Sequence, residues 1–309
     1  MSPNPTSRLS YRRHALTVRG ADAAAVVEPD AEVGEISQSP PYTEDRPSAW
    51  LNAFVGLGDW TLFSYRAVSG LFSRHLKLKE LVGVCVDVGV SSVGVVVITG
   101  VFIGMVLAVQ AYNQFHMIGL DTSIGAVIHM SIVRELGPVL AAVMLAGRVG
   151  TAMSAQLATM RVTEQIDALA CLGVDPVKFL VGPRFLGCVL VIPLLTIIAD
   201  AFGVMGSSLI CLKVFHIDEF HYWRHTANFV KLWDLFVGLG KSVIFGGVLS
   251  LICCHRGFNS RAGAEGVGRA ATEGFVLSFV AILVIDFVMA MLTNAIAAII
   301  WPGGGGRVA

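Results

Sequence analysis

Charge is what this sequence most clearly lacks. Asp, Glu, Lys and Arg make up 14% of its 309 residues, whereas about 25% is usual for a soluble protein. Apolar residues make up 55%, which leaves too little polar surface to cover a water-soluble globule. The 22 basic residues equal the 22 acidic ones, so the chain as a whole has no electrostatic attraction for nucleic acid. We therefore predict an integral membrane protein that does not bind nucleic acid.

The sequence also lacks the motifs of disulfide-stapled, metal-binding and nucleotide-hydrolysing proteins. Its six cysteines include no C-x-x-C pair, which argues against a secreted disulfide framework. His221 and His225 have a spacing that could hold zinc on a helix, but Tyr222 follows His221, so no H-E-x-x-H forms, and we expect a solvated loop. The stretch 235–242 resembles a P-loop but lacks its first glycine. We predict no catalytic residue, no metal and no cofactor.

The first 48 residues contain no apolar run, and therefore no signal-peptide core. They are rich in Ser, Pro and Ala, which predicts a disordered extension over 1–48. Arg8, Arg12, Arg13 and Arg19 stand among Ser and Thr, which leaves an organelle transit peptide as an alternative.

The pattern changes near Trp50, where apolar residues begin to recur at helical spacing. Asp59 and Arg66 interrupt any run long enough to span a membrane, while aromatic residues such as Tyr65 could anchor a helix at the membrane surface. We predict an interfacial amphipathic helix and a linker over 49–80. An ordinary surface helix packed on the domain is the alternative.

Beyond residue 81 the chain is mostly apolar. A hydrocarbon core of about 30 Å needs about 20 helical residues, and we count about five such spans, which makes the fold all-α. The predicted spans are 88–109, 122–160, 179–212, 232–254 and 274–301. No internal repeat is evident, which argues against inverted-repeat transporters.

Basic residues near the span ends predict the orientation. With the N-terminus in the cytosol, the cytosolic flanks carry eleven of them and the outer side carries four. The eleven are Arg66, Arg74, Lys77, Lys79, Arg148, Arg161, Lys178, Arg184, Arg256, Arg261 and Arg269. The four are Lys213, Arg224, Lys231 and Arg307. We therefore predict a cytosolic N-terminus.

A polar insert, 146–187, lies between the second and third spans. Gly173 suits the left-handed residue that ends a helix, and Asp175 followed by Pro176 suits the start of the next. The apolar residues expected on one face of the intervening helix are Val162, Ile166 and Leu169. Such a short, stiffly joined helix could transmit force from a soluble partner. A plain connection with capped helices explains the pattern equally well.

Charged residues inside the spans are costly and are therefore functional candidates. Arg134 and Glu135 stand beside Pro138, which removes a backbone donor and permits a kink. Glu135 could bind a lipid headgroup, anchor a partner or respond to a gate, and we expect it to tune transport without being catalytic. Alternatively, the intramembrane charges pair among themselves. The charges in question are Arg134, Glu135, Asp200, Lys241 and Asp286.

Three motifs occur in the order found in a known family. They are VRELGPVLAAVMLAGR (133–148), GRVGTAMSAQLATMRVTEQIDALACLGVDP (147–176) and GAEGVGRAATE (263–273). Together they resemble the MlaE (YrbE) permeases, the membrane subunits of ABC transporters that move lipids. The resemblance runs from about residue 50 to residue 301. The interfacial helix and linker occupy 49–80, and the permease domain is predicted as the rest of the chain, 81–309. The first 48 residues have no counterpart.

The resemblance implies five spans after an interfacial helix, and a cytosolic coupling helix that docks on an ATPase. The implied partners are two copies of that ABC ATPase, which binds ATP and Mg, a second copy of this chain, an MCE-domain lipid-binding protein on the outer side, and a lipid. Candidates for coupling are Thr163, Glu164, Gln165, Asp167, Leu169, Gly173, Asp175 and Pro176. Candidates in a second cytosolic loop are Glu265, Gly266, Gly268 and Arg269. Candidates for transport or gating are Arg134, Glu135, Pro138 and Arg148.

The predicted function is that of a non-catalytic permease subunit that moves lipids, with phospholipid as the default cargo. A bacterial inner membrane is the expected location, and a chloroplast inner envelope is the alternative. A different class of function remains open: an ATP-independent channel or proton-coupled carrier that uses Glu135, Asp200 and Asp286 as a relay. An intramembrane enzyme is disfavoured because neither H-E-x-x-H nor G-x-S-x-G occurs in the spans.

Overall fold

The computed structural model describes residues 49–73, 78–117, 119 and 123–300. The extension predicted over 1–48 lies outside these residues. All regular structure in the described part is helical, and five helices are long and apolar enough to cross a membrane. The predicted all-α membrane fold with five spans is therefore confirmed.

Four of the five spans are longer than the stretches predicted from the sequence, and the second has the predicted length but lies two residues later. The five candidate spans are Leu81–His116, Ile124–Val162, Pro176–Val214, Leu232–Phe258 and Ala264–Ile296. The elements within or continuing them are α2 (Leu78–His116), α3 (Ile124–Ser131), η2 (Ile132–Leu136), α4 (Gly137–Leu145), η3 (Ala146–Gly150), α5 (Thr151–Val162), α7 (Pro176–Leu209), η4 (Ile210–Val214), α9 (Leu232–Phe258) and α10 (Ala264–Ile300). The three η elements are π-helical segments within otherwise continuous helices.

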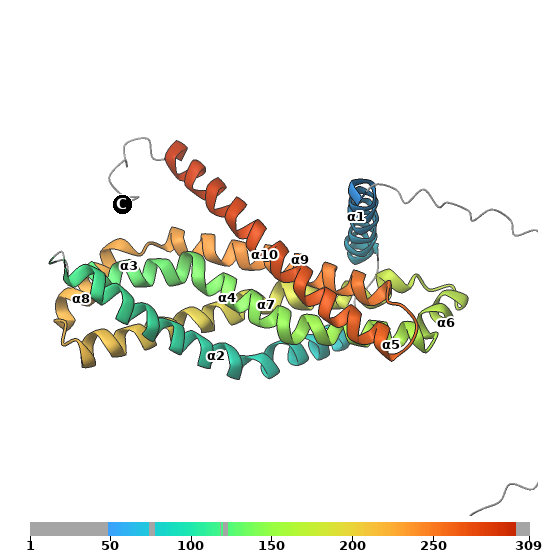
Figure 1. Cartoon of the computed structure of the whole chain (residues 1–309), viewed down its shortest axis with the longest axis horizontal. Coiled ribbons are helices and arrows are strands. Elements are labelled where there is room, and N and C mark those ends of the chain that lie inside the picture. Colours follow the sequence, from blue (N-terminus) through green and yellow to red (C-terminus); the bar gives the residue numbers. More distant parts are fainter. Residues whose placement is uncertain (1–48, 74–77, 118, 120–122, 301–309) are drawn as a thin grey trace, which may run out of the picture. The chain divides into compact units, whose positions relative to one another are not determined.

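The spans run lengthwise beside one another, with α7 between α2 and α9 (Figure 1). Their shared core contains fully buried Leu145, Leu157, Phe245 and Leu249. Helices α2 and α7 approach so closely that a Cβ built on Gly104 would overlap the carbonyl oxygen of Gly203. Small residues at such crossings allow backbone-to-backbone packing in membranes.

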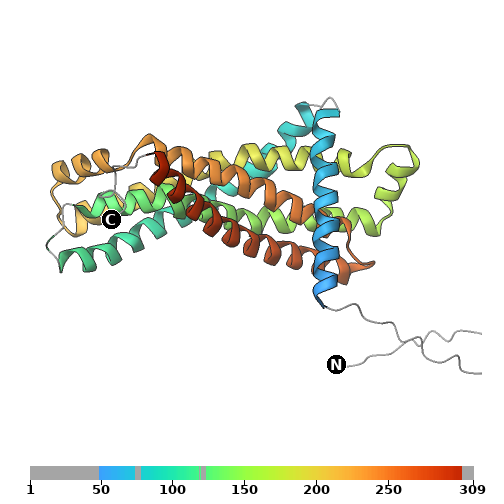
Figure 2. The ribbon, with the colours of Figure 1, turned by 90° about the horizontal axis from the view of Figure 1, so that it is seen from above.

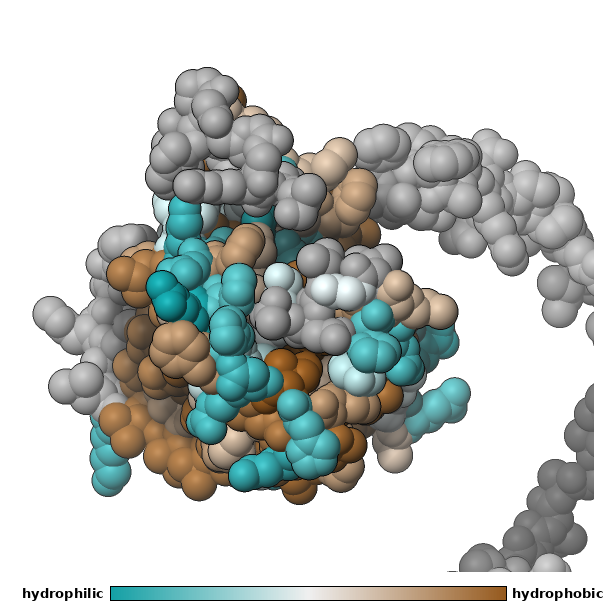
Figure 3. Space-filling view, turned by 90° about the vertical axis from the view of Figure 1, so that its left-hand side faces the viewer, coloured by the Kyte–Doolittle hydropathy of each residue, from teal (hydrophilic) through white to brown (hydrophobic). Residues whose placement is uncertain are grey.

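The two ends of the bundle differ in the short helices that they carry. The α6 end holds α6 (Gln165–Cys171) and the connection between α9 and α10, whereas the α8 end holds α8 (Glu219–Phe229) and the start of α3 (Figure 1). Hydrophilic residues run across the α8 end, with hydrophobic residues beside them (Figure 3).

Helix α1 (Ala49–Ser73) lies across the bundle near the α6 end (Figure 2). Its Gly70 packs so closely on α7 that an added Cβ would lie 2.6 Å from Cγ of Lys178. Val55, Leu62 and Tyr65 are nevertheless more than half exposed. The predicted helix is confirmed. It combines packing on the domain with the exposed apolar face that an interfacial helix needs.

The prediction of a solvated loop around His221 and His225 is wrong, because both residues belong to α8. Asp218 is the N-cap of the helix and pairs with His221, and this hydrogen bond holds the pKa of Asp218 below its ordinary value. Tyr222 is fully buried, and its hydroxyl lies 3.0 Å from Nε2 of His129 in α3. The low hydropathy of this stretch made it look like a loop. The buried Tyr222 packs the helix against the bundle.

Candidate transport site and coupling elements

A cluster of charges lies inside the bundle, around the fully buried side chain of Lys241 in α9. Its ammonium forms an ion pair with Glu135 of η2 and a second with Asp286 of α10, in which Nζ and Oδ1 are 3.0 Å apart. The Glu135 and Asp286 side chains are 35% and 22% exposed. One buried cation therefore joins the second, fourth and fifth spans.

Arg134 extends the cluster on its more open side. Its Nε lies 3.8 Å from Oε1 of Glu135, and its Nη2 donates a hydrogen bond to Oδ1 of Asn294 in α10. The cluster thus contains two cations and two carboxylates and is neutral as a unit. Neutrality matters because an unpaired charge inside a membrane is expensive. The predicted pairing of intramembrane charges is confirmed for these four residues, which we call the Lys241 cluster.

The local helix geometry explains how two adjacent charges reach this cluster. Arg134 and Glu135 lie in η2, one of the π-helical segments, and Pro138 follows at the start of α4. A π-helical turn widens the helix and changes the direction of the side chains that follow. Pro138, buried at the start of α4, lacks the N–H of an ordinary helical residue. The backbone hydrogen-bond pattern therefore changes from π-helical to α-helical at this point, and the helix continues through it.

Asp200 does not join the Lys241 cluster, so that part of the pairing prediction is wrong. It is buried in α7, and its Oδ1 has no hydrogen-bond partner among the described residues. A Cβ built on Gly137 would overlap this oxygen, so the glycine is what makes room for the carboxyl group. A relay through Glu135, Asp200 and Asp286 has no continuous chain of contacts in the described structure.

Arg148 is also separate from the Lys241 cluster. It lies in η3, thirteen residues after Glu135, or about 20 Å along a helix axis. Its side chain is exposed and lines a groove between α2, α5 and α7. The structure therefore divides the four candidates for transport or gating, with Arg134, Glu135 and Pro138 in one place and Arg148 in another.

The predicted short helix between the second and third spans is present as α6. Gly173 follows α6 and has a left-handed φ of +76°. Asp175 caps α7 by accepting a hydrogen bond from the Val177 N–H at 3.1 Å. Pro176 occupies the first turn of α7, as predicted. Ile166 is buried at 3% exposure, but Val162 belongs to α5 and is exposed, so its place on the same face is wrong.

Most coupling candidates are accessible at the α6 end. Glu164 turns the chain between α5 and α6 with a left-handed φ of 58°, which is unusual for a residue with a side chain. Asp167 pairs with Arg161 of α5 at 2.6 Å, which joins the two helices. Exposed candidates are Thr163, Glu164, Gln165, Asp167, Gly173 and Asp175, while Leu169 and Pro176 are partly buried.

The prediction of a second loop is wrong, because its four candidate residues all lie in the first turns of α10. They are Glu265, Gly266, Gly268 and Arg269. The connection is the shorter stretch 259–263. A Cβ on Gly266 would overlap the Arg261 carbonyl oxygen, which explains a glycine inside this helix. Glycines made the stretch look like a loop, although here they allow a tight turn to pack.

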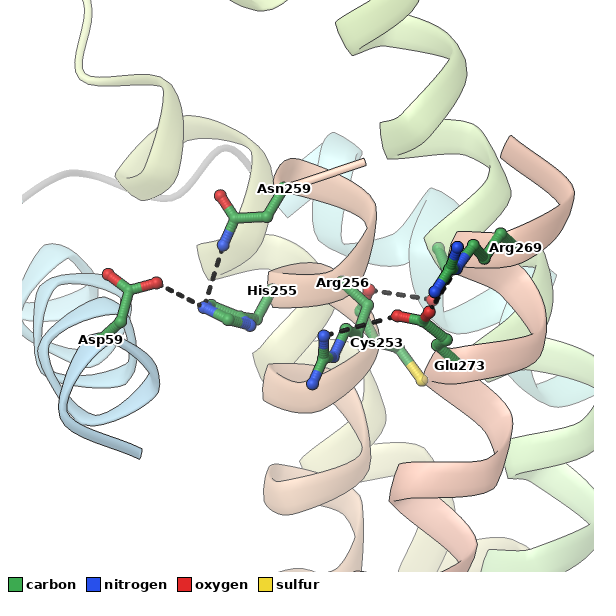
Figure 4. Close-up of polar contacts among 8 residues, drawn as sticks. Asp59, Cys253, His255, Arg256, Asn259, Arg269 and Glu273 are labelled. Atoms are coloured by element: carbon green, nitrogen blue, oxygen red, sulfur yellow. Dashed lines mark hydrogen bonds and ion pairs between the residues drawn. The ribbon is translucent and has the colours of Figure 1, made fainter. Parts of the chain in front are cut away.

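Two groups of polar contacts at the α6 end, one around Glu273 and one around His255, were not predicted (Figure 4). Glu273 accepts from Arg269 at 2.7 Å and lies 3.4 Å from Nη1 of Arg256, so it joins α9 to α10. His255 of α9 lies 3.1 Å from Oδ2 of Asp59 in α1. The latter residues are 196 positions apart in sequence, and no local pattern signals their contact.

Known proteins are similar to this chain over the same helices that form the spans and α6. A family model described as Permease MlaE matches residues 81–292. A probable ABC transporter permease protein of Rickettsia felis is 40% identical over 236 residues, which cover 76% of this chain and 91% of that protein. The probable permease slr1045 of Synechocystis is 41% identical over 205 residues, covering 66% and 78%.

A chloroplast protein is also similar. Protein TRIGALACTOSYLDIACYLGLYCEROL 1 of Arabidopsis thaliana is 37% identical over 201 residues, which cover 65% of this chain and 57% of that protein. The family match includes all five candidate spans, apart from the last residues of the fifth, and also α6. The chain therefore belongs to the MlaE permease family.

Proposed function

We propose that this chain is the membrane subunit of an ABC transporter that moves lipids, with phospholipid as its cargo. The observation that carries the proposal is α6, a short helix held between two defined turns at one end of a permease-family bundle. The proposed partner ATPase binds ATP and Mg and docks on this helix. The α6 end is then cytosolic, as the basic residues predict.

A lipid cargo is supported by the apolar surface of the spans and by one relative. Phe102 of α2 and Phe287 and Met291 of α10 are each at least 60% exposed. The Arabidopsis relative carries the name of a galactolipid. An amphiphile would place its chains against such apolar residues, and a polar headgroup near the partly exposed Arg134 and Glu135.

A second copy of the chain is part of the proposal. The fifth span buries only 11% of its apolar window and the first span 22%, compared with 50% for the second and fourth. Some of this surface faces lipid, and we propose that a second copy covers the rest. The proposed cargo cavity lies between the copies, and an MCE-domain protein continues the path at the α8 end.

Glu135 is proposed to tune transport through the Lys241 cluster. It is the carboxylate that touches both Lys241 and Arg134, so movement of α9 or α10 would change its pairing. No bond is made or broken by this chain. In our proposal the chain lies in the inner membrane of a bacterium. A chloroplast inner envelope is the alternative, since one relative is a chloroplast protein.

The test is ATP-driven lipid transport in vesicles that contain this chain with its ATPase. Glu135→Ala and Glu135→Gln, compared at equal membrane abundance, should both transport more slowly than the natural protein. Wild-type rates in both variants would discard the role of Glu135. Lipid or proton flux through this chain alone, without ATP, would favour the channel or carrier and overturn the ABC permease proposal.

A further inference from the structure

A groove of about 530 Å³ lies between α2, α5 and α7, apart from the Lys241 cluster. Its size is that of an ordinary ligand site. The polar side chains that line it are Asp87, Ser91, Arg148, Gln156 and Arg184, and apolar side chains such as Val84, Val88 and Met153 form the rest of the wall. A wall that is partly charged and partly apolar suits an amphiphile.

Among the residues that the structure describes, the charges of this groove are unpaired, unlike those of the Lys241 cluster. Within the described residues, neither Arg148 nor Arg184 forms an ion pair, and neither does Asp87. Arg184 gives one hydrogen bond to the Leu180 carbonyl oxygen of its own helix at 2.9 Å. Most of the ten N–H donors of two guanidinium groups are therefore free for a ligand.

The groove lies at a particular level of the bundle. On the side toward the α8 end, no charged residue follows Asp87 in α2, and none stands between Arg184 and Asp200 or between Arg148 and Glu135. On the other side, toward the α6 end, charged residues continue. The three groove residues therefore mark the boundary of the hydrocarbon core, where the phosphates of a lipid leaflet lie.

We infer that this groove binds a glycerophospholipid with an amine headgroup, from the leaflet at the α6 end. Arg148 and Arg184 hold the phosphate, since guanidinium groups bind phosphate oxygens with paired hydrogen bonds. Asp87 pairs with the ammonium group, and the apolar wall contacts the glycerol and the first part of the chains. Basic pockets between spans are a known setting for lipid headgroups.

A protein segment fits the groove less well than this lipid. An apolar helix from a partner would cover three charges without pairing them, and such burial is unfavourable. The zwitterionic headgroup instead offers one group of each sign. The inference rests on the proposed function only in taking lipid as the natural occupant, and it places that lipid apart from the proposed cavity at the Lys241 cluster.

The experiment measures lipid binding by the full chain without any ATPase. The purified protein is stripped of lipid and incubated with equal amounts of palmitoyl-oleoyl phosphatidylethanolamine and phosphatidylglycerol, and bound lipids are counted by native mass spectrometry. The natural protein should prefer phosphatidylethanolamine. Arg148→Gln with Arg184→Gln should bind about tenfold less of it, because charge-assisted hydrogen bonds are lost. Arg224→Gln, the same change in α8, is the matched control and should bind normally.

Asp87→Asn tests the headgroup separately, and its readout does not depend on how much protein is folded. The ratio of bound phosphatidylethanolamine to phosphatidylglycerol should fall several-fold in this variant. An unchanged ratio would overturn the assignment of the amine, and unchanged binding in the double arginine variant would overturn the site. A photo-crosslinker, Ser91→p-benzoylphenylalanine, should capture lipid, whereas capture of protein would overturn the lipid as occupant. All these outcomes leave the ABC permease proposal standing, since no transport is measured.

Discussion

The Lys241 cluster and the groove around Arg148 contain similar charged residues, but these form ion pairs in the cluster and none among the described residues in the groove. In the cluster, two cations and two carboxylates from three spans contact one another, and the central ammonium is fully buried. In the groove, two cations and one carboxylate surround an open volume without forming ion pairs in the described structure. The difference teaches that charge in a span has two roles. Paired charge holds helices together, while unpaired charge at the membrane boundary remains available to a ligand.

Removing the central cation of the Lys241 cluster should have the largest effect on stability. Lys241→Ala leaves Arg134 as the one cation beside two carboxylates, and Asp286 loses its ion pair, which should lower the free energy of unfolding by about 3–5 kcal/mol. Thermal unfolding in detergent, together with membrane abundance, measures the loss. Lys241→Ala combined with Asp286→Asn is the control, since Arg134 and Glu135 then remain as a pair of opposite charges. If this double variant is no more stable than the single one, the cluster is not held by its charges.

A smaller effect should follow when Asp200 is displaced. Gly137→Ala places a Cβ where Oδ1 of Asp200 lies, and such overpacking typically costs about 1–3 kcal/mol. Gly94→Ala is the matched control, because nothing lies within 4 Å of a Cβ at that position of α2. Unfolding of both variants in the same detergent checks the prediction. Equal stability of the two would show that Asp200 has more room than the structure gives it.

Neutralising the groove should change stability little, in contrast with the cluster. Arg148→Gln and Arg184→Gln remove charges that make no ion pair in the described structure, so each should shift the free energy of unfolding by less than about 0.5 kcal/mol. The same melting measurement in lipid-free detergent checks this. A loss comparable to that of Lys241→Ala would mean that the arginines stabilise the fold and are not reserved for a ligand.

A similarly small effect, confined to α1, should come from the contact between α1 and α9. Asp59→Asn weakens an exposed partner of His255, and surface pairs are worth about 0–1 kcal/mol. Global stability should hardly change, but hydrogen exchange of α1 should become faster, with α10 as the internal reference. Unchanged exchange in α1 would show that Gly70 and the apolar contacts hold the helix without Asp59.

Local signals in the sequence predicted the elements and several of their ends. The long apolar runs marked all five spans, although only the first of them is uncharged, and Gly173, Asp175 and Pro176 each occupy the position that their chemistry favours. These predictions succeed because backbone conformation and transfer to lipid depend mainly on neighbouring residues. Failures had local causes too. The polar composition of α8 and the glycines at the start of α10 imitated loops.

The groove illustrates what sequence reasoning missed. Arg148 was singled out from its span, whereas Asp87 and Arg184 were read only as flanking charges or not at all. Their helices are separated by long stretches of chain, and only packing shows that the three side chains line one volume. The contact of Glu135 with Lys241 joins residues 106 positions apart. A pattern within one helix could not reveal it.

By itself, the sequence determined that this protein is a helical membrane protein, where its spans lie and where the chain turns between the second and third. These properties follow from hydropathy and backbone preference, which act over a few residues. Only the tertiary structure decided which charges neutralise one another and which remain open. Pairing requires atoms a few ångströms apart, and that distance is set by how α2, α7, α9 and α10 pack, which no single segment encodes.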